Sequence, residues 1–259
     1  MIQEAALPYV TADLTPALTT AFARLRDPRL ANPAWLRHLD ADALTPQEPP
    51  IGELELFERA LIAPVAAEIG VHTRGHSEEL RIALDPVGAL YLTRRDRGPY
   101  EWMDGAAQET PDLLAALLPA GTPLAASPHM TPRTDVNALR FTDEQRHEIA
   151  ERAANGTPAA EAIAVQQDLD PRLRDALLSD RERAWFEITM HVPAAEAGAE
   201  PFLFHLLRRW NVGELGLYSA DGENGFADTI HAVEPGDLLG TVLPILGEGE
   251  KLAHGEAAA

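Results

Sequence analysis

One motif occurs twice in this chain, 125 positions apart, and this repeat constrains the fold more than any other feature of the sequence. When Val87–Pro119 is laid over Val212–Pro244 without a gap, 12 of the 33 positions are identical. The shared text is Val-Gly-x-Leu-x-Leu, a polar turn, and then Asp-Leu-Leu-x-x-x-Leu-Pro. A solenoid needs at least about three stacked units, so a unit that occurs twice favours a two-lobed domain. The alternative is a chance match between two segments rich in Leu and Ala.

Local patterns predict helices and antiparallel strands in both lobes. Alternating apolar residues predict strands at Glu79–Leu84, Leu90–Leu92, Tyr100–Trp102, Trp185–Val192, Leu215–Tyr218 and Thr229–Val233. Helical spacing and caps predict helices at Ala17–Leu25, Trp35–Leu39, Glu53–Ile69, Leu113–Leu118, Pro201–Trp210 and Leu238–Leu246, and three more after Thr142, Thr157 and Asp170. Pro64 is expected to kink or divide its helix. The expected class is α+β, with helices packed on a mainly antiparallel sheet.

We expect one domain over residues 1–259, divided into two lobes by a Pro-rich connection. Lobe one covers about residues 1–120, the connection 121–137, and lobe two about 138–247, followed by a frayed tail at 248–259.

Composition excludes several classes of function. The net charge of −20 argues against nucleic acid and anionic membranes as partners, because both require basic patches. The absence of cysteine excludes disulfides, thiolate catalysis and cysteine-ligated zinc. No stretch approaches the roughly 18 apolar residues of a membrane span, and Met1–Val10 does not resemble a secretory signal. We therefore expect a soluble cytoplasmic protein.

No motif names a catalytic centre. His72 and His76 are four residues apart, but the fuller His-Glu-x-x-His pattern is missing, so a solvated loop is favoured over a metal site. The segment Asp221–Gly225 resembles part of a calcium loop, yet a tight turn explains the same residues. Histidines are scattered over the second lobe without a shared spacing: His147, His191, His205 and His231. We expect no catalytic residue, no metal and no cofactor; the alternative is a metal-dependent hydrolase or small-ligand-binding protein with a His/Asp/Glu site between the lobes.

The strongest candidate for partner binding is a basic, aromatic hairpin in an otherwise acidic chain. Arg and aromatic side chains are common anchors of protein interfaces. The candidate residues are Arg94, Arg95, Arg97, Tyr100 and Trp102. The alternative is an ordinary solvated hairpin with Trp102 packed under the helices.

The C-terminal part of the chain contains Gly213-Glu214-Leu215-Gly216-Leu217-Tyr218, followed by Val233-Glu234-Pro235-Gly236-Asp237-Leu238-Leu239. With the duplicated halves, these motifs resemble the EspG family, the cytosolic chaperones of actinobacterial type VII (ESX) secretion. The resemblance is detailed only over Gly213–Leu246, and its motifs are turn and core residues. A composition with one lysine, Lys251, beside many arginines is typical of GC-rich coding DNA, as in actinobacteria.

The resemblance implies a quasi-two-fold domain, in which a central antiparallel sheet is flanked by two helical bundles. The implied activity is to bind a helical secretion substrate, typically a PE–PPE pair, and to keep it soluble without a cofactor. A loop beside the sheet helps to hold the substrate in that family, and the matching position here is the Arg94–Trp102 hairpin. The expected helix Pro201–Trp210 departs from the family pattern, which leaves the identity of the client open.

Overall fold

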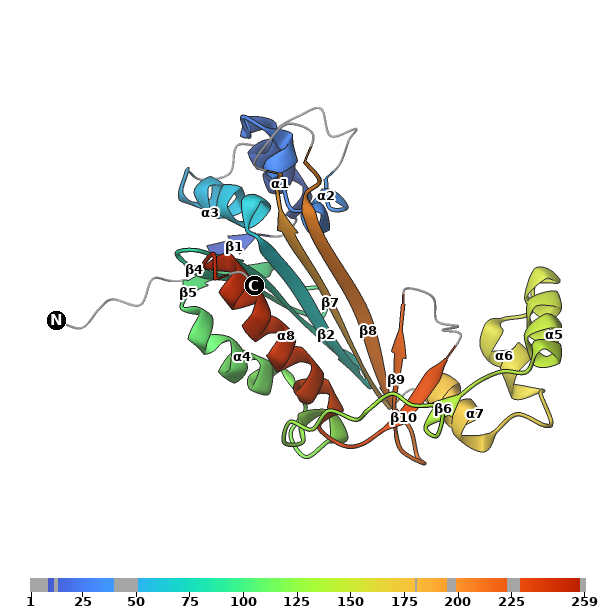
Figure 1. Cartoon of the computed structure of the whole chain (residues 1–259). Helices are drawn as coiled ribbons and strands as arrows, with labels where there is room; N and C mark the ends of the chain where they lie inside the picture. The colour runs from blue at the N-terminus through green and yellow to red at the C-terminus, as the bar shows by residue number, and fades with distance from the viewer. Residues whose placement is uncertain are drawn as a thin grey trace.

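The described part of the chain forms one ten-stranded antiparallel sheet. The computed structural model describes residues 9–11, 14–39, 51–179, 181–194, 199–222 and 229–256. The strand order is β1-β5-β4-β3-β2-β7-β8-β9-β10-β6 (Figure 1). The strands are β1 (Tyr9–Thr11), β2 (Val65–Thr73), β3 (His76–Asp85), β4 (Gly88–Arg95), β5 (Tyr100–Gly105), β6 (Ala138–Leu139), β7 (Glu182–Val192), β8 (Phe202–Val212), β9 (Leu217–Asp221) and β10 (Ile230–Val233).

The central pair, β2 and β7, joins two segments that are more than 100 residues apart in the chain. Their register runs from Val65 opposite Met190 to Thr73 opposite Glu182. Outward from this pair, each side of the sheet contains three further strands in chain order, β3-β4-β5 on one side and β8-β9-β10 on the other. Each side ends in a short strand from an earlier segment, β1 or β6.

Eight α-helices in the described part of the chain cover the sheet from both faces (Figure 1). They are α1 (Leu14–Arg24), α2 (Pro33–Leu36), α3 (Ile51–Ile62), α4 (Thr110–Leu117), α5 (Asp143–Ala154), α6 (Ala159–Ala164), α7 (Pro171–Leu178) and α8 (Asp237–Ala253). Short 3-10 turns occur at Pro28–Leu30, Ala107–Glu109 and Pro123–Ala125. The mixed helices and large antiparallel sheet confirm the expected α+β class.

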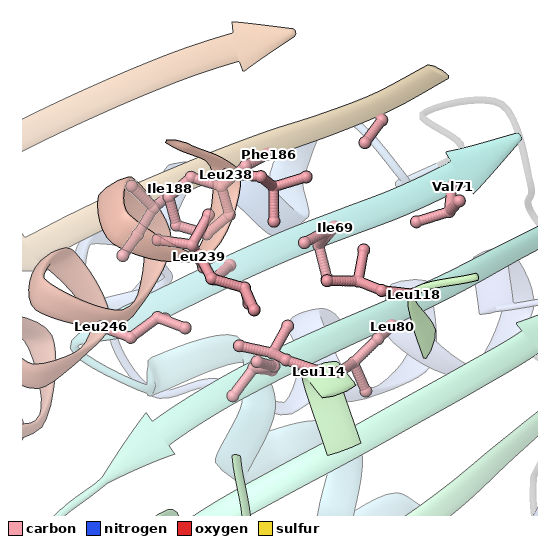
Figure 2. Close-up of a cluster of buried hydrophobic side chains, with 14 of the residues drawn as sticks. Ile69, Val71, Leu80, Leu114, Leu118, Phe186, Ile188, Leu238, Leu239 and Leu246 are labelled. Carbon is pink, nitrogen blue, oxygen red and sulfur yellow. The ribbon is translucent and has the colours of Figure 1, made fainter. Parts of the chain in front are cut away.

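The largest core lies between the sheet and the helices α4 and α8, on what we call the α8 face. Side chains at alternate strand positions, such as Ile69, Ile82 and Ile188, point toward Leu114 of α4 and Leu238 of α8. Figure 2 shows side chains of β2, β3 and β7, among them Ile69, Leu80 and Ile188, converging with those of α4 and α8. Burying a large apolar side chain contributes roughly 1.5–3 kcal/mol, which makes this layer a major source of stability.

Two separate groups of helices pack on the opposite face, which we call the outer face. Helices α1 and α3 cover β3, β4 and β5, where Phe57 meets Trp102 edge-on with ring centroids 4.5 Å apart. Helices α5, α6 and α7 cover β9 and β10 around Tyr218 and Ile230. Figure 1 shows the two groups at opposite ends of the long strands β7 and β8.

One expected helix is wrong, and another is expected to be longer than it is. Leu203, Leu206, Leu207 and Trp210 have helical spacing, but the segment forms strand β8, paired with β7 at all 11 positions. The expected helix Glu53–Ile69 instead ends at Ile62, and Pro64 separates α3 from β2. Long-range pairing decides both cases, since it satisfies every backbone group of a central strand.

The structure also tests the predictions for the chain end and for the connection between the lobes. Helix α8 continues to Ala253, so the expected frayed tail from residue 248 is wrong over its first residues. The connection 121–137 contains only a 3-10 turn, as expected. It is anchored by the fully buried Asp237, whose carboxylate accepts hydrogen bonds from Arg133 at 2.7 Å and from the Thr131 amide at 2.9 Å. Trp210 Nε1 donates a third hydrogen bond to this carboxylate at 2.8 Å.

Candidate docking surface

The most distinctive polar surface is on the outer face, where two rows of side chains cross the β2–β7 pair. We call these two rows, together with Arg37 and His205, which bond to the second row, the central face. The strand registers place Arg94, Glu79, Gly70, Trp185 and Arg209 side by side in the first row. The second row, two residues further along the strands, contains Arg81, Glu68, Glu187 and Leu207. Charged groups therefore flank an aromatic ring in the middle of the sheet.

The second row brings two carboxylates directly opposite each other. Glu68 of β2 faces Glu187 of β7, an arrangement that is destabilising when nothing separates the charges. Arg37, which follows α2, reaches across this pair and forms ion pairs with both carboxylates. Arg81 bonds the other side of Glu68 at 3.3 Å, and His205 bonds Glu187 at 3.1 Å. Arg37 thus holds the end of α2 against the sheet.

The ionisation of this network follows from its contacts. Burial raises the pKa of Glu187, but hydrogen bonds from Arg37 and His205 outweigh burial and hold that pKa below its usual value. Burial in the first place, and then the guanidinium groups of Arg81 and Arg37, lower the pKa of His38 to about 4. His38 is therefore neutral near pH 7. Its Nε2 accepts a hydrogen bond from Arg81 Nη1 at 3.0 Å, because a guanidinium can only donate.

The first row contains the aromatic centre of the surface. The half-buried Trp185 ring lies over Gly70, and a Cβ at position 70 would lie only 1.9 Å from the ring. Glycine is required here because any side chain would displace the indole. Glu79, next to Gly70 in the row, is half-buried, and burial together with the nearby Glu68 raises its pKa. The surface thus offers a flat apolar ring beside a carboxyl group that protonates more easily than usual.

The structure divides the sequence-predicted hairpin into buried and exposed parts. Trp102 is 1 % exposed and Tyr100 is 8 % exposed, so neither side chain is a surface anchor, which corrects that part of the expected partner-binding set. Arg94 covers the Tyr100 ring at 4.7 Å and bonds its hydroxyl at 2.8 Å. Arg95 and Arg97 are exposed at the hairpin tip. The sequence does contain a signal for this burial: Tyr100 and Trp102 are two residues apart on a strand, so their side chains lie on the same face.

Tyr100 also connects the hairpin to the central face. Arg81 lies over its ring at 5.5 Å and Arg94 at 4.7 Å, so the phenol contacts guanidinium groups from both rows of the central face. The hairpin was predicted as a separate patch; in the structure its buried base adjoins the second row.

The histidines singled out in the sequence are spread over several strands and α5. His72 and His76 are exposed at the end of the β2–β3 hairpin, and His76 Nδ1 lies 3.6 Å from Asp96. His191 is buried, whereas His205 belongs to the central face. The part of the chain that the structure describes contains no group of three or more His, Asp or Glu arranged to hold a metal ion.

The remaining motifs act as local structural elements where they are described. Thr142 and Gln145 form the expected capping box of α5, and Asp170 caps α7 through the Arg172 amide. Asp221 forms an ion pair with Arg208 at 2.6 Å, while Glu223–Gly225 of the candidate calcium loop lie outside the described residues.

Comparison with known proteins does not assign the chain to a family: no protein-family model matches it, and no similar sequence is found among curated proteins. No described helix is long and apolar enough to cross a membrane.

Sequence reasoning missed the main residues of the central face. Arg37, Glu68, Arg81 and Glu187 are spread over 150 positions, and no local spacing connects them. A weak signal was present in β2 and β7, where a single Glu interrupts an apolar run at Glu68 and again at Glu187. Only the strand register reveals that these two residues face each other.

Proposed function

We propose that this chain is a non-enzymatic chaperone or adaptor of the EspG type, which binds a helical secretion substrate on the central face. One observation carries the proposal: a mixed aromatic and charged surface lies between two groups of helices, at the seam of the sheet. The client in this proposal is a PE–PPE-like pair or a similar helical protein, kept soluble in the cytoplasm before export.

The strand order supports an origin by duplication. The two copies of the sequence repeat cover equivalent elements of the two sides. The first copy covers β4, β5 and α4, and the second covers β9 and β10 and the first part of α8. We therefore propose that the two sides of the sheet descend from one ancestral unit and are related by a quasi-two-fold axis between β2 and β7. A duplicated scaffold of this kind places its shared surface at the seam, where Glu68 faces Glu187 and Gly70 faces Trp185.

The chemistry of the central face suits the tip of a helical protein. The Trp185 ring can pack against an aliphatic side chain, while the carboxylates and guanidinium groups around it can pair with polar groups at the rim. In this proposal, the exposed Arg97 at the hairpin tip contacts the client, whereas Arg95 pairs with Glu78 on the α8 face. This arrangement requires no metal and no cofactor.

A co-purification experiment tests the proposal. The tagged full-length chain is expressed in the cells that produce it, and bound proteins are identified by mass spectrometry. We expect small helical secreted proteins in stoichiometric amounts. Gly70→Val should lose most of this client, because the added side chain displaces Trp185, and Leu215→Ala, which alters an exposed loop residue, should retain it.

Two results would overturn the proposal. One is recovery of no helical secreted protein by the wild-type chain. The other is stoichiometric zinc or manganese in the purified protein together with hydrolase activity, which would favour the alternative of a metal-dependent enzyme. Circular dichroism of Gly70→Val shows whether a loss of binding comes from local displacement or from unfolding.

A further inference from the structure

In the described part of the chain, strand β8 has no partner along half of its outer edge. It is 11 residues long, but β9 pairs with it only from Arg208 to Val212. One further bond, from the Gly222 amide to the Leu207 carbonyl, closes this ladder. Among the described residues, no strand pairs with the outer side of β8 from Phe202 to Leu206. Figure 1 shows β7 and β8 continuing well past the end of β9.

The direction of the open backbone groups follows from that last bond. The Leu207 carbonyl points outward to Gly222, and the backbone groups of an antiparallel strand alternate between its two sides. The amide and carbonyl groups of Leu203 and His205 therefore point outward as well. Those of Phe202, Phe204 and Leu206 point inward to β7, their partner along this stretch.

The open edge carries exposed apolar side chains. Phe202 is 52 % exposed, Leu203 56 % and Phe204 39 %, and Val192, opposite Phe202 on β7, is 37 % exposed. An unpaired strand edge with apolar side chains is a template for pairing with another strand. A monomeric protein commonly protects such an edge with charged residues or proline, yet the segment from Phe202 to Leu207 contains neither.

We propose that this edge pairs with the same edge of a second copy of the chain, in an antiparallel arrangement centred on Phe204. The two copies of Phe204 then form a pair without direct backbone bonds. Leu203 of each copy lies opposite His205 of the other, and their outward amides and carbonyls form four hydrogen bonds across the two-fold axis. Phe202 of one copy lies opposite Leu206 of the other, on the same face of the sheet as the Phe204 pair.

A second copy fits this edge because the segment is self-complementary. Residues 202–207 read Phe-Leu-Phe-His-Leu-Leu, so antiparallel self-pairing brings no like charges together while histidine is neutral. The rest of the chain carries a net charge of −20, so long-range repulsion opposes association and salt should relieve it. Four backbone bonds and a few apolar side chains form a small contact, so the dimer should be in equilibrium with the monomer.

The absence of cysteine from the chain permits a direct test. In the proposed dimer the two Cα atoms of residue 204 lie about 4.5 Å apart, within the range that a disulfide spans. We expect Phe204→Cys to form a covalent dimer under mild oxidation, with yield rising in high salt. The control Leu215→Cys, at a 63 % exposed loop position, should form little. Equal yields for both variants, or no dimer with Phe204→Cys, would overturn the proposal.

Analytical ultracentrifugation of the unmodified chain provides an independent measurement. We expect a concentration-dependent mass between that of one and two chains. Phe204→Lys should raise the dimer dissociation constant at least about tenfold, because two like charges then face each other, while Leu215→Lys should leave it unchanged. A wild-type chain that is monomeric at its highest soluble concentration would refute self-association. Equal melting temperatures of the two lysine variants would exclude misfolding as the cause. Neither experiment depends on the proposed client.

Discussion

The two sides of the sheet have the same strand order outward from the β2–β7 pair, but they differ in how completely they are built. On the first side, β4 pairs with β3 at eight positions, whereas on the second side β9 pairs with β8 at five. The closing helices differ in the same way: α4 has 8 residues and α8 has 17. The two sides therefore share their strand order, whereas the strand lengths differ and leave backbone groups at the described edge of β8 without a partner strand.

Corresponding residues of the two sides also differ in burial and in hydrogen bonding. Asp112 and Asp237 occupy the same repeat position, yet Asp112 is exposed at the start of α4 and Asp237 is fully buried. Trp102 and Trp210 are the buried indoles of the first and second sides. In the described structure, Trp210 Nε1 has a carboxylate partner and Trp102 Nε1 has none.

The largest difference is expected between the two repeat aspartates. Asp237→Ala should lower the free energy of unfolding by about 3–5 kcal/mol, because it leaves the Arg133 guanidinium, whose side chain is only 16 % exposed, without its counter-ion. Asp112→Ala should change it by less than about 0.5 kcal/mol. Urea denaturation of both variants measures the contrast, and similar losses would show that the two positions have equivalent environments.

A smaller difference is expected between the two tryptophans. Trp210→Phe should cost about 2–3 kcal/mol, because it removes a hydrogen bond to a charged group and leaves part of the Asp237 carboxylate unpaired. Trp102→Phe should cost about 1 kcal/mol, since the ring still packs against Phe57 and no described hydrogen bond is lost. Urea denaturation measures both losses. An m-value equal to that of the wild type would show that each variant unfolds from the same native fold, so that the two losses can be compared.

The smallest effect concerns pH and the attachment of α2. The pKa of His38 is about 4 in the folded chain and about 6.5 when unfolded, so the unfolded chain binds more protons between these values. The contribution of His38 to the free energy of unfolding is therefore complete above pH 6.5 and is lost as the pH drops toward 4. We expect His38→Gln to reduce that fall by about 1–2 kcal/mol, a value discounted because the imidazole is partly exposed to solvent.

The matched control for this pH effect is His147→Gln on α5, an exposed histidine in the second helical group. Denaturation at several pH values should give the wild-type profile for this control. If His38→Gln also leaves the profile unchanged, folding does not lower the pKa of the imidazole.

The fold was partly predictable because several elements depend on local chemistry. The capping box at Thr142 and Gln145, the turn at Asp85–Gly88 and the alternation of β3 and β7 all follow from neighbouring residues. β8 could not be predicted in this way, because its leucines also have helical spacing and only pairing with β7 distinguishes the two. The central face was unpredictable for a related reason: Glu68 and Glu187 meet through the register of strands far apart in the chain.

The sequence by itself determined the α+β class, the repeated segment, the Pro-rich connection and most helix starts, because these depend on composition, periodicity and capping within a few residues. Only the tertiary structure decided that Trp102 is core, that Arg37 bridges two facing carboxylates, and that β8 outruns β9. Each of those outcomes depends on which strands pair, in which register and over what length, and these choices minimise buried unpaired backbone groups across the whole sheet.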